Sequence, residues 1–372
     1  MYCSARMIPS LPDYLLFFFG LAILIAGAEM FVRQAVWLAG LIGKSSLFVG
    51  LTVAAFGTSA PELAIGITGQ LSHSSDIGLG NVIGSNIFNV FFVLGLAALV
   101  QPMVVKRSTV YRDIPILLAI CVFFYLLVLD GSVGNSEALL LVAVLAGYLY
   151  YLARISNQRT VAPTSDSHQG EKSQSAGRII QTFALIVVSI AMMILASQWM
   201  VAGAVSMAAG LGMSEFVIGL TIVAAGTSLP EIATTLAAVR HDQHELALGN
   251  VMGSCLFNIV AVPAAMALVS SSPLPVVNEA VSVDIPIMIL AIVACLPFFF
   301  SGHRLSRMEG TLFLVYYGGY ALMLYYRHVP GSVLSAYQTE LGLLAVPIIV
   351  VTTVFVLVQV VRDRRRRRSA DG

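Results

Sequence analysis

Long apolar stretches separated by short polar segments run through the whole chain. A helix that crosses a bilayer needs roughly 20 mostly apolar residues. Because lipid offers no partners to backbone N–H and C=O groups, stretches of about this length predict membrane-spanning α-helices. Eleven spans are expected, at residues 14–32, 47–70, 79–100, 114–129, 137–153, 179–200, 215–239, 246–269, 284–300, 310–326 and 341–361.

Composition supports this interpretation. The 372 residues are 58% hydrophobic and only 10% charged, which is typical of a polytopic membrane protein. The first apolar stretch is too long for a secretory signal, and no small-residue cleavage site follows it, so we expect a retained span. Cys3, Cys121, Cys255 and Cys295 show no CxxC spacing and are expected to be packing residues rather than ligands or disulfides.

One block of sequence occurs twice. Residues 50–63 read GLTVAAFGTSAPEL and residues 219–232 read GLTIVAAGTSLPEI, which places Glu62 and Glu231 169 residues apart. Such a repeat indicates two copies of one structural unit. The same offset relates two polar triplets, Asn81, Ser85 and Asn89 in the first half and Asn250, Ser254 and Asn258 in the second.

Five predicted spans belong to each copy, so each copy crosses the membrane an odd number of times and the second is inverted. Inverted repeats are the architecture of many alternating-access transporters. We therefore predict an all-α polytopic membrane protein with two inverted five-helix repeats and one extra C-terminal transmembrane helix. The expected divisions are a first repeat at 1–155, a cytoplasmic linker at 156–177, a second repeat at 178–328, and the extra helix with a basic tail at 329–372.

Basic residues predict the orientation. Cytoplasmic loops of membrane proteins carry an excess of Lys and Arg, so the arginine-rich segment 362–368 should be cytoplasmic. Counting back from it places most basic loops on the same side and the N-terminus outside. Glu29 in the first span lies one turn before Arg33, and we expect these two to pair near the cytoplasmic interface.

The duplicated block has the chemistry of a cation site. Pro61 and Pro230 lack an N–H and so leave the carbonyls of Gly57 and Gly226 without helical partners, which a membrane tolerates only where protein, water or an ion satisfies them. A buried acid alone costs about 2.5 to 3.5 kcal/mol on insertion scales, so packing explains a matched pair poorly. Beside the prolines stand a carboxylate and two hydroxyls per copy, Thr58, Ser59 and Glu62, and Thr227, Ser228 and Glu231.

The polar triplets add amide and hydroxyl oxygens. Their spacing of four residues places each triplet on one helical face. Asn81 and Asn250 could equally bond between helices or cap a helix start, whereas Asn89 and Asn258 are expected to point at the site. Glycines four residues apart beside each triplet allow close helix packing. Oxygen ligands without a Cys or His cluster suit Ca²⁺ or Na⁺ rather than zinc or copper.

The motifs GTSAPE with GNVIGSNIFN and GTSLPE with GNVMGSCLFN resemble those of the cation/calcium exchanger superfamily, specifically its prokaryotic sodium/calcium antiporters. The resemblance covers roughly residues 15–326. It implies electrogenic exchange of Na⁺ for Ca²⁺ with the first and sixth helices sliding across a fixed core. It also implies the ion ligands Glu62, Glu231, Thr58, Ser59, Thr227, Ser228, Ser85, Asn89, Ser254 and Asn258, with carbonyls of Ala55 and Ala224.

Three departures from the family pattern matter. The potassium-dependent branch carries an acid where this chain has Asn258, so K⁺ cotransport is not expected. Cys255 replaces the asparagine that matches Asn86, which puts an equal role for Asn86 in doubt. The proton-coupled branch has an acid where this chain has Gly84 and Gly253, which weakens the Ca²⁺/H⁺ alternative without excluding it.

These observations predict a Na⁺/Ca²⁺ antiporter of the inner (plasma) membrane, with a Ca²⁺/H⁺ antiporter of the same fold as the alternative. We expect no enzyme activity, no cofactor and no nucleic-acid partner, only the two ions, membrane lipids and a monomeric chain. An intramembrane hydrolase is disfavoured because there is no HExxH motif and no Ser/His pair within the spans. The inverted, proline-broken halves favour alternating access over a channel.

Overall fold

The computed structural model describes residues 13–71, 75–156, 176–210, 224–270, 272–300, 303–327 and 345–354. Over these ranges the chain is helical except for turns and four two-residue strands, as expected for an all-α protein. Three of the cysteines expected to be packing residues, Cys121, Cys255 and Cys295, are free and buried in the core. Cys3, most of the linker (157–175) and the basic tail lie outside the described residues.

The first half contains five helical units, three of them with π-helical or broken segments. They are α1 (Asp13–Leu41); α2 (Ser46–Val49), η1 (Gly50–Ala54), α3 (Ala55–Thr58) and α4 (Ala60–Leu71); α5 (Ser75–Ile87), η2 (Phe88–Val93) and α6 (Leu94–Val100); β1 (Met103–Val104), η3 (Thr109–Asp113) and α7 (Ile114–Leu127); and β2 (Ser132–Val133) with α8 (Asn135–Ser156).

The second half follows the same plan. Its elements are α9 (Ala176–Gly210); α11 (Ala224–Thr227) and α12 (Leu229–Arg240); α13 (His244–Leu268); β3 (Leu274–Pro275), η5 (Ala280–Asp284) and α14 (Ile285–Phe300); and β4 (Arg304–Leu305) with α15 (Arg307–Arg327). A short apolar helix, Ala345–Val354, lies beyond them.

Length and composition support most of the predicted spans. Seven of the described helices are long and apolar enough to cross a membrane, and the bent pair Ser46–Thr58 and Ala60–Leu71 makes an eighth. The prediction at 215–239 begins in residues that are not described, and 341–361 is described only in part. The prediction at 310–326 corresponds to α15, which is long enough but contains five tyrosines and does not reach the apolarity of the others.

The two small sheets join the repeats symmetrically. β1 pairs with β4, bringing Met103 opposite Leu305, and β2 pairs with β3, bringing Val133 opposite Leu274. β1 and β3 occupy equivalent places in the two halves, as do β2 and β4, so each sheet is the image of the other. η3 and α7 separate β1 from β2, so the sheets lie at opposite ends of a membrane-length helix. This arrangement agrees with the predicted inversion.

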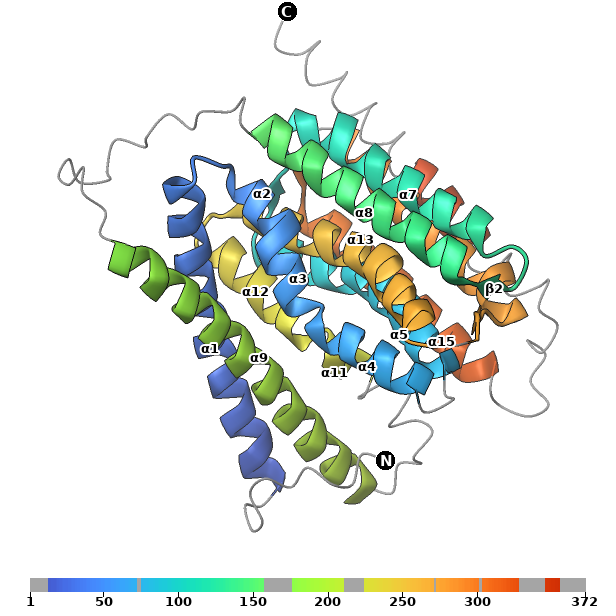
Figure 1. Cartoon of the computed structure of the whole chain (residues 1–372), viewed down its shortest axis with the longest axis horizontal. Helices are drawn as coiled ribbons and strands as arrows, with labels where there is room; N and C mark the ends of the chain where they lie inside the picture. Colours follow the sequence, from blue (N-terminus) through green and yellow to red (C-terminus); the bar gives the residue numbers. More distant parts are fainter. Residues whose placement is uncertain are drawn as a thin grey trace, which may run out of the picture.

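Figure 1 shows how the bundle is organised. α13 lies at its centre, in contact with α2, η1, α3, α4, α5, α8 and α12, and most of its side chains are buried. α1 and α9 cross each other along one edge of the bundle (Figure 1) and make extensive contact. The central helices therefore form a core, and α1 and α9 form a separate pair against it.

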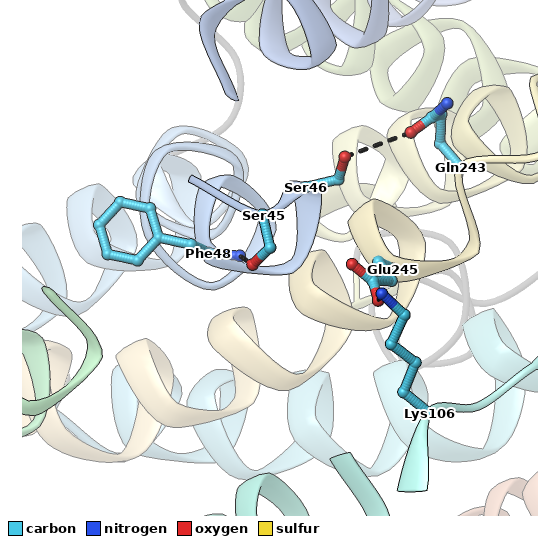
Figure 2. A network of polar contacts seen from close by, with 6 residues as sticks. All are labelled: Ser45, Ser46, Phe48, Lys106, Gln243 and Glu245. Carbon is cyan, nitrogen blue, oxygen red and sulfur yellow. Dashed lines mark hydrogen bonds and ion pairs between the residues drawn. The ribbon is translucent and has the colours of Figure 1, made fainter. Parts of the chain in front are cut away.

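A polar network fixes one end of this core (Figure 2). Ser45 caps α2 by accepting a hydrogen bond from a backbone N–H three residues later. The hydroxyl of Ser46 donates to Oε1 of Gln243 over 3.3 Å, and Lys106 forms an ion pair with Glu245. Through these contacts the start of α2 and the segment before η3 are both held against the start of α13.

The loops that meet at this end are those predicted to be cytoplasmic. Besides the network in Figure 2, Lys44 donates to the carbonyl of Ala153 near the end of α8 over 2.9 Å, and β1 pairs with β4. β2 and β3, both predicted to be external, pair at the other end. The spatial grouping of the loops thus agrees with the predicted topology.

The α1–α9 pair contacts the two halves unequally. α1 packs along α12, whereas no comparable contact joins α9 to α4, the equivalent helix, within the described residues. Accordingly, Ala64 and Thr68 on α4 are exposed, while their images on α12 are half-buried Ala233 and buried Ala237. Among the described residues, the α12 end of the bundle is therefore covered by α1, and the α4 end is less covered.

The expected pair of Glu29 with Arg33 is wrong. Oε2 of Glu29 lies 2.5 Å from Nε2 of His241, in the turn that follows α12. The reason is that Glu29 faces α12, whereas Arg33, although one turn away, is exposed. This contact ties α1 to the core at the closed end.

Candidate cation site

A break in each duplicated helix places the two acids. Ser59 separates α3 from α4 with φ −83° and ψ 6°, and Ser228 separates α11 from α12 with φ −91° and ψ 11°. The first-repeat helix bends by 43° at this break. Each new helix carries its acid, Glu62 or Glu231, in its first turn, where the helix dipole favours a negative charge.

Each carboxylate receives hydroxyls from both repeats. Oε1 of Glu62 accepts from Ser85 of its own repeat and from Ser228 of the other, both over 3.4 Å. These O···O distances are long compared with the 2.5–3.0 Å of strong O–H···O bonds. Cation–oxygen contacts can therefore replace them at little cost.

The second carboxylate has the mirror-image contacts. Oε1 of Glu231 accepts from Ser254 of its own repeat over 3.5 Å and from Ser59 of the other over 3.4 Å. Because each GTS serine reaches the acid of the opposite repeat, the duplicated blocks interlock. The structure thus brings together, in one cluster, residues that the sequence separates by 169 positions.

The threonine of each GTS motif also forms a hydrogen bond with the opposite repeat, to the first asparagine of its polar triplet. Oγ1 of Thr58 donates to Oδ1 of Asn250, and Oγ1 of Thr227 donates to Oδ1 of Asn81, both over 3.2 Å. Both asparagines lie well inside their helices, which begin at Ser75 and His244. Of the two roles left open by the sequence, they therefore bond between helices and do not cap a helix start.

Asn86 and Cys255 mark the pseudo-two-fold axis. They are equivalent positions, and each contacts the backbone of the other: Nδ2 of Asn86 donates to the Cys255 carbonyl over 3.0 Å, and Sγ of Cys255 lies 3.9 Å from the Asn86 carbonyl. Contact between equivalent residues requires that both lie near the axis. Asn86 and Cys255 therefore do not have equal roles, because the amide nitrogen of Asn86 donates to the backbone of the second repeat.

Four buried oxygens at the cluster have no hydrogen-bond partner among the described residues. They are Oε2 of Glu62 and Glu231 and Oδ1 of Asn89 and Asn258, and all four side chains are fully buried. Nδ2 of the two asparagines likewise has no partner among the described residues. Neither acid forms an ion pair with a described Lys or Arg. Buried polar atoms normally have partners, and a buried charge is normally compensated, so the cluster has the electrostatics of a cation site.

The remaining predicted ligands lie on the two broken helices. Ala55 is buried in α3, and its carbonyl already accepts from the N–H of Ser59 over 3.0 Å, leaving one lone pair. Ala224 begins α11. Thr227 is half-buried. Within the described part of the chain no three His, Cys, Asp or Glu side chains gather, so the chemistry rests on two carboxylates and neutral oxygens.

One residue of the cluster was not predicted from the sequence. Oγ1 of Thr235, one turn after Glu231, accepts from Nδ2 of Asn250 over 3.1 Å. The duplication gave no signal for it, because the equivalent position in the first repeat is Gly66. The duplication therefore points to candidate ligands that occur in both copies, but not to Thr235, which contacts Asn250 in the second copy only.

Comparison with known proteins agrees with this architecture. The family model described as sodium/calcium exchanger protein matches residues 13–154 and 181–326. CaxA of Alkalimonas amylolytica is 34% identical over 313 residues, which cover 82% of this chain and 96% of that protein. The sodium/calcium exchanger MaX1 of Methanosarcina acetivorans is 31% identical over 347 residues, covering 84% and 99%.

The fold is also that of a solved exchanger. The structure of the sodium-calcium exchanger NCX_Mj superimposes with a TM-score of 0.69 and 27% sequence identity, over 82% of this chain and 95% of that one. Both halves of this chain are matched by the family model, each with its broken helix and its acid. The chain therefore belongs to the sodium/calcium exchanger family and is a multi-pass integral membrane protein.

Proposed function

We propose that this protein is a secondary antiporter that exchanges Na⁺ for Ca²⁺ across the plasma membrane by alternating access. One observation carries the proposal: two carboxylate and two amide oxygens, equivalent by the repeat, are buried where the inverted halves meet and have no partners within the described part of the chain. Hard oxygen ligands of this kind suit Ca²⁺ and Na⁺. The exchanger activity named for MaX1 and NCX_Mj supports the same function.

Shared ligands provide the coupling. Glu62 and Glu231 together neutralise one Ca²⁺, and the same carboxylates with neighbouring hydroxyls and amides can instead hold Na⁺ ions. Because both ions use the same oxygens, binding of one excludes the other. We propose as ligands Glu62, Glu231, Thr58, Ser59, Thr227, Ser228, Ser85, Asn89, Ser254 and Asn258, with the carbonyls of Ala55 and Ala224.

The unequal packing of α1 and α9 supports alternating access. In this structure α1 closes the bundle along α12, at the predicted cytoplasmic end, and α4 is less covered. Because the repeats are inverted, the mirrored arrangement would place α9 along α4 and free α12. Movement of the α1–α9 pair against the core would thus open the cluster to one side at a time.

Three uncharged residues on the helices that flank the site bear on which ion is exchanged for Ca²⁺. Asn258 is an amide, and Gly84 and Gly253 carry no side chain, so these three positions add no acid to the two glutamates. This favours Na⁺ over H⁺ as the exchanged ion. We further propose a monomer in contact only with membrane lipids, with repeats at 1–155 and 178–328.

The test is transport by the purified protein in liposomes. A Na⁺ gradient should drive Ca²⁺ uptake, and Glu62→Gln and Glu231→Gln should each abolish it, because each removes a charge from the site. Glu245→Gln is the control, since this half-buried carboxylate pairs with the exposed Lys106 at one end of the core, outside the cluster. Uptake that survives both site substitutions would refute the proposal.

A further inference from the structure

We propose that Thr235 is a positioning residue that orients Asn250 and, through Asn250, the hydroxyl of Thr58. As a result, the half of the cation cluster that contains Thr58 and Glu231 is preorganised. The half that contains Thr227 and Glu62 lacks this support. This inference rests on the proposed function, because it concerns the same ions. Thr235 itself lies one helical turn beyond Glu231, and its hydroxyl contacts the amide of Asn250.

The two ends of the Asn250 amide face different partners. Nδ2 donates to Oγ1 of Thr235 over 3.1 Å and approaches the carbonyl of Glu231 at 3.5 Å, while Oδ1 accepts from Oγ1 of Thr58 over 3.2 Å. An asparagine amide has a donor end and an acceptor end. The carbonyl of Glu231 can only accept and therefore selects the donor end, the hydroxyl of Thr235 accepts the second N–H, and the acceptor end faces Thr58.

The direction of the Thr58 proton follows from this. Its single hydroxyl proton is directed at Oδ1 of Asn250, so its lone pairs face away from the amide. A hydroxyl binds a cation only through its lone pairs. If the Asn250 amide were rotated by about 180°, its Nδ2 would donate to Oγ1 of Thr58. The hydroxyl proton of Thr58 would then point in another direction, including toward the ion.

The contacts continue to the carboxylate and close a ring. Oγ1 of Thr58 lies 3.2 Å from Oγ of Ser254, which donates to Oε1 of Glu231 over 3.5 Å. Because both hydroxyl protons are donated elsewhere, the contact between these two oxygens contains no proton. Glu231 and Thr235 are on one face of α12. All five side chains of this ring of contacts are fully buried, and hydrogen bonds in a buried environment help to fix geometry. Thr235 is the member farthest from the ion and holds the ring in one arrangement.

The first repeat lacks this support. Asn81 accepts from Thr227, as Asn250 accepts from Thr58, but Gly66 stands where Thr235 would be, and Nδ2 of Asn81 has no partner among the described residues. Packing requires the glycine: a Cβ on Gly66 would lie 2.8 Å from Cγ1 of Val262 and 3.0 Å from Sδ of Met266. The two halves thus offer the same ligands with different rigidity.

Substitutions at Thr235 separate positioning from packing. Thr235→Val keeps the shape and removes the acceptor, whereas Thr235→Ser keeps the acceptor and removes a methyl group. Thr234→Val is the matched control, because Thr234 is equally buried but its hydroxyl contacts Sδ of Met193 over 3.4 Å, outside the ring.

The readouts are equilibrium Ca²⁺ binding to the purified protein in detergent and Na⁺-driven Ca²⁺ flux in liposomes. We expect Thr235→Val to raise both the Kd and the KM for Ca²⁺ about tenfold, because it leaves a buried N–H poorly satisfied, with little change in kcat. Thr235→Ser and Thr234→Val should stay near wild type. A purely structural role would instead lower kcat and yield of folded protein while leaving Kd unchanged.

The outcomes also distinguish this proposal from the function on which it rests. Wild-type binding by Thr235→Val, equal impairment of Thr235→Ser, or equal impairment of Thr234→Val would each overturn the positioning role. Wild-type protein that binds Ca²⁺ but shows no Na⁺-driven flux would overturn the antiporter function, and the Kd comparison would still decide the role of Thr235. Wild-type protein that binds no Ca²⁺ would overturn both.

Discussion

Substitution of Gly253 by alanine tests how closely the core approaches the broken helix. α13 packs against η1 and α3 through its small residues, and a Cβ on Gly253 would lie 2.6 Å from Cβ of Ala55, 2.8 Å from Cα of Leu51 and 2.9 Å from the Leu51 carbonyl oxygen. None of these atoms belongs to a flexible side chain. One of the two helices must therefore move to accept the methyl group.

The expected cost follows from this geometry. Extra methyl groups in packed cores typically cost about 1–3 kcal/mol, and Gly253→Ala should lie at the upper end because no rotamer change relieves the contacts. Helix propensity partly opposes this, since alanine is favoured over glycine by about 1 kcal/mol. Ala55 begins α3, which carries Thr58, so the displacement should also reach the cation cluster and raise the KM for Ca²⁺.

Thermal unfolding in detergent and Ca²⁺ flux in liposomes provide the assay. Gly147→Ala in α8 is the control, because Gly147 is exposed and a Cβ there would meet no described atom within 4 Å. We expect Gly253→Ala to unfold several degrees below wild type and Gly147→Ala to unfold at or slightly above it. Equal melting temperatures and equal Ca²⁺ KM values for the two variants would refute the reasoning.

Two further predictions follow from the contacts. Ser59→Ala and Ser228→Ala each remove one hydroxyl from the carboxylate of the opposite repeat, over the same 3.4 Å, so both should raise the KM for Ca²⁺ several-fold in flux assays; an effect of only one would argue against the interlocked site. Glu29→Gln and His241→Gln each remove the ion pair between α1 and the closed end of the core. Both should therefore increase labelling, from the cytoplasmic side, of cysteines introduced along α12. Unchanged labelling would contradict the role of this contact.

The sequence predicted those parts of the fold and site that depend on periodicity and duplication. Apolar length gave most of the spans, and the offset of 169 residues brought Glu62 and Glu231 together. Proline next to each acid indicated the break that the structure shows at Ser59 and Ser228. These features are local or repeated, so the chain itself contains the information.

Features that depend on tertiary packing could not be predicted in this way. Glu29 has a basic neighbour one turn away, but the packing of α1 on α12 gives it His241 instead. Thr235 has no polar counterpart because Val262 and Met266 exclude a side chain at Gly66. The exchange of two-residue strands between repeats involves segments too short to have a sequence pattern.

Ion-replacement transport tests the central claim most directly. Liposomes containing only the purified protein would be given Na⁺, K⁺ and pH gradients separately, and Ca²⁺ movement would be followed. Two carboxylates with neutral oxygens, and no acid at positions 84, 253 and 258 of the flanking helices, predict Ca²⁺ uptake driven by a Na⁺ gradient alone. Uptake driven by a pH gradient and indifferent to Na⁺ would contradict the account.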